Sequence, residues 1–371
     1  MEFIDLKAQY RTYQDELEEA ALRVLRSGRY ILGPEVEELE EKLAAFVGRP
    51  YALGVSSGTD ALLIILKALG IGPEEAVLTT PFTFAATAEV IKRCGAHLIF
   101  ADVSEKTFTL SPETVIKALE EASQKGLSPK AILAVGLFGL PAFLLELEEL
   151  ASSKGLFLIE DACQSLGARA RGRPSGSFGI AAATSFFPAK PLGGYGDGGM
   201  IFTSEAELYE KMKALRVHGQ TARYEHTYVG FNARLDTLQA ALLLVKLKHF
   251  PAEIEKRQEI ARRYREGLKG LPIAFQEVPE DCLSVYAQFT LVVEERDALQ
   301  AFLRERGIPT AVYYPKPLHL QPAFRDLGYR EGDFPVAESL ARRVISLPMH
   351  PFLAPREQDT IIQAVRGFYG A

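Results

Sequence analysis

The spacing of apolar residues changes between two periods along most of the chain. Short apolar runs predict buried strands at 51–55, 76–80, 97–103, 131–137 and 156–161. Between and around them, apolar residues that recur every three or four positions predict helices at 11–26, 34–47, 60–69, 83–94, 111–124 and 143–154. Strands that alternate with helices indicate βαβ units. We therefore expect an α/β fold with a parallel or mixed sheet covered on both faces.

The last third of the chain has a different pattern. Residues 206–216 and 234–249 are again predicted to be helical, the second with a long apolar face. A charged helix at 252–269 follows, then a strand at 287–293, a helix at 296–306 and the proline-rich segment YYPKPLHLQP. We expect a large domain over 1–249, beginning with a helical arm, and a smaller α+β domain over 250–371.

Composition excludes several classes of protein. The net charge is −6 and no long basic run occurs, which argues against a nucleic-acid-binding surface. Cys94, Cys163 and Cys282 are far apart, so we expect neither a disulfide framework nor a metal site, and we expect a cytoplasmic location. The N-terminus lacks the apolar core of a signal peptide, and the best apolar run, 61–71, is too short to span a membrane.

Two segments carry candidate chemistry. LFLIED (156–161) ends a predicted strand with Asp161, and TSFFPAKPLGGYGDGG (184–199) places Lys190 in a tight turn of prolines and glycines. Loops at the carboxyl ends of parallel strands are where α/β folds bind ligands. A lysine and an aspartate so placed suit pyridoxal phosphate (PLP), which needs a Schiff-base lysine and a carboxylate for its pyridinium nitrogen. Taken singly, Lys190 could be a solvated loop lysine and Asp161 a helix N-cap.

Other residues could complete such a site. In SSGTDAL, Gly58 and Thr59 begin a predicted helix, whose free N–H groups favour a phosphate, although an ordinary N-cap has the same sequence. Ser185 could donate a further hydrogen bond to that phosphate. Gln164 lies one helical turn after Asp161 and could reach the 3-oxygen of the ring. Phe84 could stack on the ring, or pack in the core as most phenylalanines do.

The order of these motifs resembles one family closely. DLKAQY, SGRYILGPEVEELE, SSGTDAL, PFTFAATAEVI, EDACQSLGA, FFPAKPLGGYGDGGM, FNARLDTLQAA and YYPKPLHLQPAF are similar to motifs of the DegT/StrS-type nucleotide-sugar aminotransferases, which are fold-type I PLP enzymes. The resemblance implies Lys190 as the Schiff-base lysine, Asp161 as the pyridinium partner and Gln164 as the 3-oxygen contact. It also implies Gly58, Thr59 and Ser185 as phosphate ligands and Phe84 as the stacking ring. Asn232 and Arg234 would reach the phosphate of the neighbouring subunit, which implies a homodimer with shared active sites.

The resemblance also implies a reaction. We expect an aminotransferase that moves an amino group, with L-glutamate as donor, to a nucleotide-linked ketosugar. RLDTLQAA and VYYPKPLH look most like the subgroup that aminates C3, with C4 as the alternative. We expect His319 and Tyr314 to touch the sugar, although His319 could equally be structural. Gly136 and Leu140 replace a histidine and a glutamine common in the family, which could alter specificity.

Three other functions are compatible with parts of this pattern. A PLP-dependent sugar dehydratase would need histidine at the position of Lys190. A transcriptional regulator is disfavoured by the acidic balance and by the absence of a recognisable helix-turn-helix motif. A catalytically dead paralogue is disfavoured because Lys190, Asp161 and Gln164 are all present.

Overall fold

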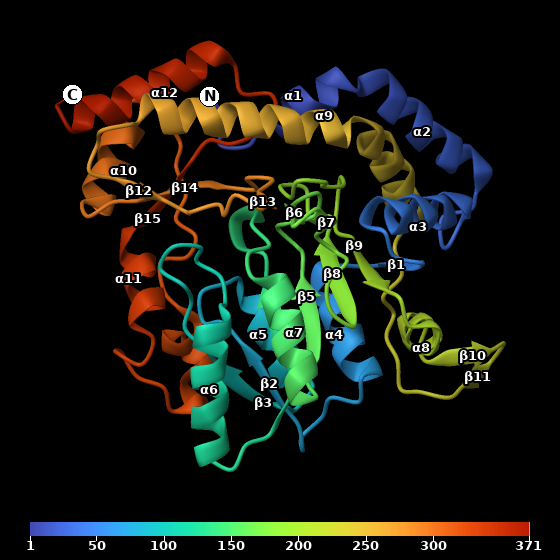
Figure 1. Ribbon diagram of the computed structural model, residues 1–371. Helices are drawn as coiled ribbons and strands as arrows, with labels where there is room; N and C mark the ends of the chain where they lie inside the picture. Colours follow the sequence, from blue (N-terminus) through green and yellow to red (C-terminus); the bar gives the residue numbers. More distant parts are fainter. Residues whose placement is uncertain (371) are drawn as a thin grey trace.

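The computed structural model describes residues 1–370, and a seven-stranded sheet lies at the centre of its larger part (Figure 1). The strands follow the order β1-β9-β8-β5-β4-β2-β3 across the sheet. All are parallel except β9, which runs antiparallel to both β1 and β8. The predicted α/β fold with a mixed, mostly parallel sheet is therefore confirmed. The strand bounds are β1 (Tyr51–Val55), β2 (Ala76–Thr79), β3 (His97–Phe100), β4 (Pro129–Val135), β5 (Phe157–Asp161), β8 (Ala181–Ser185) and β9 (Gly199–Thr203).

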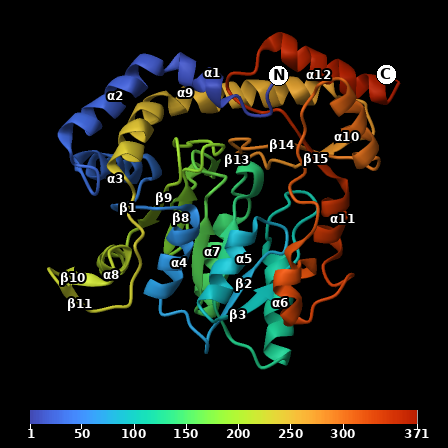
Figure 2. The ribbon, with the colours of Figure 1, turned by 180° about the vertical axis from the view of Figure 1, so that it is seen from behind.

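Helices cover both faces of this sheet (Figures 1 and 2). They do so because its strands carry apolar side chains on both faces, which must be buried. One face packs on α4 (Gly58–Ala68), α5 (Ala85–Arg93) and α8 (Ala206–Arg216). The other packs on α3 (Pro34–Val47), α6 (Pro112–Gln124), α7 (Leu144–Lys154) and the first half of α9 (Thr237–Gly267). The predicted helices at 34–47 and 206–216 match α3 and α8 at both ends.

The long helix α9 differs from the prediction. We expected two helices, 234–249 and 252–269, but one helix continues from Thr237 to Gly267 with Pro251 inside it. In Figure 1 the helix bends along its length. Proline removes one backbone hydrogen bond and bends a helix, but packing on both sides of residue 251 keeps the two halves joined. The predicted arm helix at 11–26 is likewise divided differently, into α1 (Leu6–Thr12) and α2 (Gln14–Ser27).

A smaller unit follows α9. Its three-stranded antiparallel sheet consists of β12 (Ala274–Phe275), β14 (Phe289–Val292) and β15 (Val344–Leu347), with α10 (Arg296–Glu305) and α12 (Pro355–Phe368). The predicted boundary at 249/250 falls inside α9, and the division into two domains at that point stays a prediction. Helix α11 (Pro335–Arg343) packs Ala337, Leu340 and Ala341 into the core of the large sheet. The two parts therefore share apolar core.

The remaining strands are short. β6 (Arg169–Ala170), β7 (Arg173–Pro174) and β13 (Cys282–Leu283) form a small sheet that joins the large part to the chain after α9. β10 (Gln220–Ala222) and β11 (Glu225–His226) form a hairpin that projects away from the body of the molecule (Figure 2). Within residues 1–370, none of the helices combines the length and hydrophobicity needed to cross a lipid bilayer.

Candidate active site

A cavity of about 420 Å³ opens where β2, β4, β5 and β8 end. Loops meet there because parallel strands end at the same edge of a sheet. The predicted residues on its wall come from five separate segments, and they are Gly58, Thr59, Phe84, Asp161, Gln164, Ser185, Lys190 and Tyr314. Residues that are distant in sequence are thus brought together around one space.

Asp161 is the last residue of β5, and the residue is 4% exposed. Thr87 donates its hydroxyl to Oδ2 at 2.9 Å, and the Cys163 backbone N–H donates to Oδ1 at 3.1 Å. These bonds fix the orientation of the carboxylate while leaving room for a further donor at the cavity. Burial and the nearby Asp161 charge hold the pKa of the Cys163 thiol well above its usual range, so this thiol stays neutral beside Asp161.

Lys190 lies in a tight turn after β8. Its backbone N–H donates to the Phe187 carbonyl at 2.8 Å, and the Gly194 N–H donates to the Phe186 carbonyl at 2.7 Å. The side chain is half-buried and lines the same cavity as Asp161 and Cys163. The turn therefore presents one amine to the cavity from a fixed backbone.

The start of α4 suits an anion. Ser57 caps the helix by accepting a hydrogen bond from the Asp60 N–H at 3.0 Å, which leaves the first N–H groups, those of Gly58 and Thr59, without an intrahelical partner. A Cβ on Gly58 would lie 2.8 Å from the Cβ of Ser185 and 2.8 Å from the Cys163 Sγ. Only glycine lets the helix start approach the end of β8 this closely. The result is a cradle of donors for a phosphate.

Gln164 and the aromatic residues form another part of the wall. Gln164 Oε1 accepts from the Phe138 N–H at 2.9 Å, and its Nε2 donates to the Tyr314 hydroxyl at 3.3 Å. Burial raises the pKa of Tyr314, so the phenol keeps its proton. The Phe84 side chain is 56% exposed and its ring centroid lies 6.3 Å from that of Tyr314. An exposed ring at the cavity is available to stack on a flat ligand.

Three predicted residues lie elsewhere in the chain. Asn232 and Arg234 line a second hollow of about 450 Å³, which shares Asp197 with the Lys190 cavity. His319 lies in a one-turn helix, Leu318–Leu320, where its ring is buried and Nε2 lies 3.0 Å from the carboxylate of Glu338. It is not among the residues that line the Lys190 cavity, and its contact with the sugar stays a prediction.

The two family replacements also lie off the cavity wall. A Cβ on Gly136 would lie 2.2 Å from the Ser165 hydroxyl, so a larger side chain there would displace that serine. Leu140 is fully buried. In this fold both residues pack the segment beneath the cavity.

Sequence reasoning missed several wall residues. Ile4 comes from the N-terminal segment, Thr87 from α5, and Gln288 and Tyr313 from the smaller unit. The Oε1 atom of Gln288 is buried without a hydrogen-bond partner in residues 1–370. Only Thr87 had a sequence signal, as a polar residue in the first turn of the helix after Phe84. The others depend on tertiary packing.

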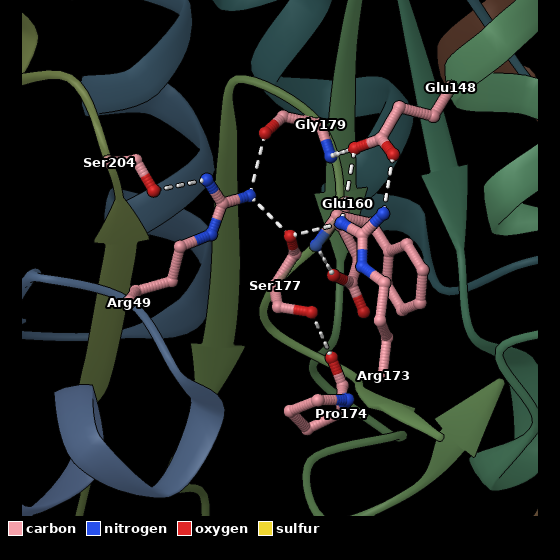
Figure 3. A network of polar contacts seen from close by, with 9 residues as sticks. Arg49, Glu148, Glu160, Arg173, Pro174, Ser177, Gly179 and Ser204 are labelled. Carbon is pink, nitrogen blue, oxygen red and sulfur yellow. Dashed lines mark hydrogen bonds and ion pairs between the residues drawn. The ribbon is translucent and has the colours of Figure 1, made fainter. Parts of the chain in front are cut away.

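A buried polar network lies behind Asp161. Glu160, fully buried on the opposite face of β5, accepts hydrogen bonds from the Gly176 N–H at 2.9 Å, the Phe178 N–H at 3.1 Å and the Ser175 hydroxyl. Figure 3 shows the surrounding contacts: Arg173 forms an ion pair with Glu148 at 2.7 Å, and Arg49 donates hydrogen bonds to the Ser177 and Gly179 carbonyls at 2.6 Å. This network fixes the loop that precedes β8.

The residues present fit PLP. The cradle at Gly58 matches a phosphate, Asp161 matches a protonated ring nitrogen, and Lys190 supplies the amine that the aldehyde requires. The three groups line one cavity and are held by different elements, so a flat ligand could contact all of them together.

Comparisons with known proteins agree with this geometry. Residues 11–366 match the model of the DegT/DnrJ/EryC1/StrS aminotransferase family. A UDP-2-acetamido-2-deoxy-3-oxo-D-glucuronate aminotransferase from Pseudomonas aeruginosa is 45% identical over 95% of this chain and 96% of its own length. A pleiotropic regulatory protein from Geobacillus stearothermophilus is 43% identical over 99% of this chain and 98% of its own.

Solved structures share the whole fold. DesV from S. venezuelae, in complex with a ketimine intermediate, superposes with a TM-score of 0.95 at 41% identity, covering 100% of this chain and 98% of that one. Other similar structures hold the cofactor in its pyridoxamine form. The predicted family is therefore confirmed. This chain belongs to the DegT/DnrJ/EryC1/StrS aminotransferase family, and it is an enzyme of the transaminase type that uses PLP.

Proposed function

We propose that this enzyme transfers an amino group from an amino acid, L-glutamate, to the C3 keto group of a nucleotide-linked sugar, with Lys190 and Asp161 as its catalytic residues. The observation that carries the proposal is the convergence of Lys190, Asp161, Gln164, Gly58 and Ser185 on one cavity. The preference for C3 over C4 rests on the name of the P. aeruginosa relative, a 3-oxo-sugar aminotransferase.

Bound PLP supplies an electron sink for the pair of electrons released when a Cα–H bond breaks. Asp161, held by Thr87 and the Cys163 N–H, would keep a proton on the ring nitrogen. Lys190 would hold the cofactor through its side-chain amine and, when that amine is free, would take a proton from the donor's Cα as general base and return a proton as general acid. Gln164, oriented by the Phe138 N–H, donates toward the 3-oxygen of the ring.

Gly58, Thr59 and Ser185 would hold the phosphate of the cofactor, and Phe84 would stack on its ring. Tyr314 accepts a hydrogen bond from Gln164, so its own hydroxyl proton is free to donate toward the sugar. His319 has no part in this proposal. The alternatives lose support here. A dehydratase would have another residue in place of Lys190, and a regulatory name is a property of the relatives that carry it, whereas this chain retains the predicted cavity groups.

The lysine assignment is tested by reduction and mapping. Borohydride fixes the cofactor on the lysine that holds it, and we expect the labelled peptide to contain Lys190. Lys190→Ala should abolish turnover but leave the fold intact. A label on another lysine would refute the assignment.

Substrate choice is tested separately with 3-keto and 4-keto sugars carrying UDP or dTDP, with glutamate as donor. Faster turnover of the 4-keto compounds would overturn the C3 preference.

We also propose a cytoplasmic homodimer with shared sites. PLP phosphate carries close to two negative charges, by analogy with other phosphate monoesters. Lys190 is the only cationic side chain on the cavity wall within residues 1–370, and it serves the aldehyde. Arg234 and Asn232 lie outside their own chain's cavity, in the adjoining hollow. A partner's Arg234 would supply the missing charge with a fork that fits phosphate.

Subunit complementation tests the shared site. Lys190→Ala and the double variant Asn232→Ala/Arg234→Ala are each expected to be inactive. When subunits exchange, each mixed dimer has one site with both defects and one with neither, so activity should return toward half per mixed dimer. Proven exchange without any recovery would mean that Asn232 and Arg234 serve their own chain.

A further inference from the structure

One face of α9 carries polar residues at intervals of two helical turns. Gln239, Lys246 and Glu253 are seven positions apart, which places them in a row along the helix. Apolar residues surround the row, and Leu243, Leu244 and Val245 next to Lys246 are all buried. Burying charged groups in such surroundings is costly unless each finds a partner. The partners of this row connect the Lys190 turn to the N-terminal arm.

The first two residues of the row, Gln239 and Lys246, hold the Lys190 turn. Gln239 Oε1 accepts from the Tyr195 N–H at 2.8 Å, and Lys246 Nζ donates to the Gly193 carbonyl. Lys246 is 2% exposed, and its ammonium lies 5.4 Å from the centroid of the Tyr195 ring. A Cβ on Gly194 or Gly196 would lie 2.9 Å from the Gln239 amide. The glycines after Lys190 therefore allow the turn to lie directly against α9.

The third residue holds the arm. Glu253 is 3% exposed and accepts from Gln9 Nε2 at 3.0 Å and from the Tyr13 hydroxyl at 3.1 Å. The arm begins with Ile4, which lines the Lys190 cavity. One turn further, buried Arg257 donates to the Tyr286 carbonyl at 3.2 Å in the smaller unit. Burial lowers the pKa of Lys246 to about 8, and the negative charge of Glu253 opposes that fall.

We propose that Lys246 is a positioning residue for Lys190, because its ammonium anchors the Gly193 carbonyl and so fixes the turn that presents the catalytic amine. This role rests on the proposed assignment of Lys190. Lys246 touches neither substrate nor cofactor, since it is not on the cavity wall. Without it, the Gly193 carbonyl would be buried without a donor, a condition that proteins relieve by moving the backbone. The turn after Lys190 would then loosen.

The test compares three variants of the full-length protein. Lys246→Met removes the donor at nearly constant volume, and Lys246→Gln keeps a donor without the charge. Lys248→Met is the control. It makes the same lysine-to-methionine change two residues away, at an exposed lysine whose surface ion pair with Glu16 is 3.3 Å long. Hydrogen exchange is measured for residues 187–196 of the cofactor-free protein. The absorption spectrum, kcat and KM are measured after PLP is added.

Lys246→Met loses a charged hydrogen bond. We therefore expect hydrogen exchange in the Lys190 turn to become faster, and kcat to fall, each by about 10-fold or more. The cofactor spectrum should shift, and KM should change little. Lys246→Gln should restore part of both the slow exchange and kcat, and Lys248→Met should match the wild type. Unchanged exchange and spectrum in Lys246→Met would overturn the proposal, even if its stability fell. If Lys246→Met does not fold, Lys246→Gln decides the matter: its shorter, uncharged side chain should leave exchange faster than in the wild type, and exchange equal to the wild type would overturn the role given to the ammonium.

Borohydride mapping separates this inference from the function on which it rests. If the wild type is labelled at a lysine other than 190, the assignment of the catalytic lysine fails, whatever the variants show. If Lys190 is labelled in the wild type and in all variants, any effect of Lys246 acts on the position of a correctly assigned residue. The positioning role then stands or falls on the exchange and spectral measurements alone.

Discussion

The buried carboxyl of Glu160 makes stability depend on pH in a direction that can be measured. Glu160 is fully buried, and this desolvation raises its pKa to about 7, although Ser175, the Gly176 and Phe178 N–H groups and the Arg49 charge act in the opposite direction. Between the ordinary carboxyl value and pH 7, the folded state therefore holds a proton that the unfolded state has released. The free energy of unfolding must fall as pH rises through this window.

The magnitude follows from the same shift. A rise in pKa from about 4.5 to about 7 corresponds to about 3 kcal/mol, at about 1.4 kcal/mol per pH unit. This contribution is complete below pH 4.5 and lost above pH 7. Glu160→Gln cannot exchange that proton, so the wild type should lose about 3 kcal/mol relative to the variant between pH 4.5 and 8.

Denaturant unfolding of the cofactor-free protein, at one protein concentration, measures this difference at several pH values. Glu148→Gln is a suitable control. Burial raises the pKa of Glu148, but its bonds to Arg173 and the Gly179 N–H outweigh this and lower the pKa overall. Stability from Glu148 is thus lost only as pH falls below the ordinary carboxyl range, and its difference from the wild type should stay flat from pH 5 to 8. A constant difference for Glu160→Gln over that window would refute the reasoning.

Three further predictions concern the cavity. Asp161→Asn should bind PLP but lose most turnover, because the ring nitrogen loses its charged partner, and a fully active variant would contradict the assigned role. Gly58→Ala should weaken PLP binding by about 10-fold, since the added Cβ would lie 2.8 Å from Ser185 Cβ and overpacking typically costs about 1–3 kcal/mol. Gly72→Ala is the control, because the atom nearest to its added Cβ lies at 3.6 Å. Equal PLP affinities in the two variants would contradict the phosphate cradle. Gln288→Leu should raise KM for one substrate, because Gln288 lines the cavity and its buried Oε1 has no partner within residues 1–370. Unchanged steady-state kinetics with both substrates would exclude contact.

The sequence was informative where function depends on a local motif. Asp161 and Gln164 lie at the end of one apolar strand, and Lys190 lies in a turn of prolines and glycines. Their meeting at one sheet edge could therefore be predicted from the α/β pattern. Ile4 and Gln288 could not be predicted, because no local pattern says which distant segment will close the cavity. Lys246 was hidden for a related reason: it lies within an apolar helix and its partner, Gly193, is 53 residues away.

The helix break predicted before Pro251 failed for a physical reason as well. A proline costs a helix one hydrogen bond and some strain, but burial of Phe250 on one side and of Arg257 and Ile260 on the other outweighs that local cost. His319 shows the opposite limit. A proline-stiffened loop suggested a binding loop, yet Glu338 on α11 gives the imidazole a buried partner away from the cavity.

The core shared by α11 and the large sheet limits how the active site can open. Many two-part enzymes admit substrate by swinging one lobe about a hinge, which requires an interface that separates easily. Here Ala337, Leu340 and Ala341 lie in the same apolar core as the central strands, and α9 runs unbroken between the two parts. Rotation of the smaller part would expose that core to water. We therefore expect substrate entry to depend on smaller elements at the cavity, such as the segment that carries Ile4, rather than on rotation of the smaller part.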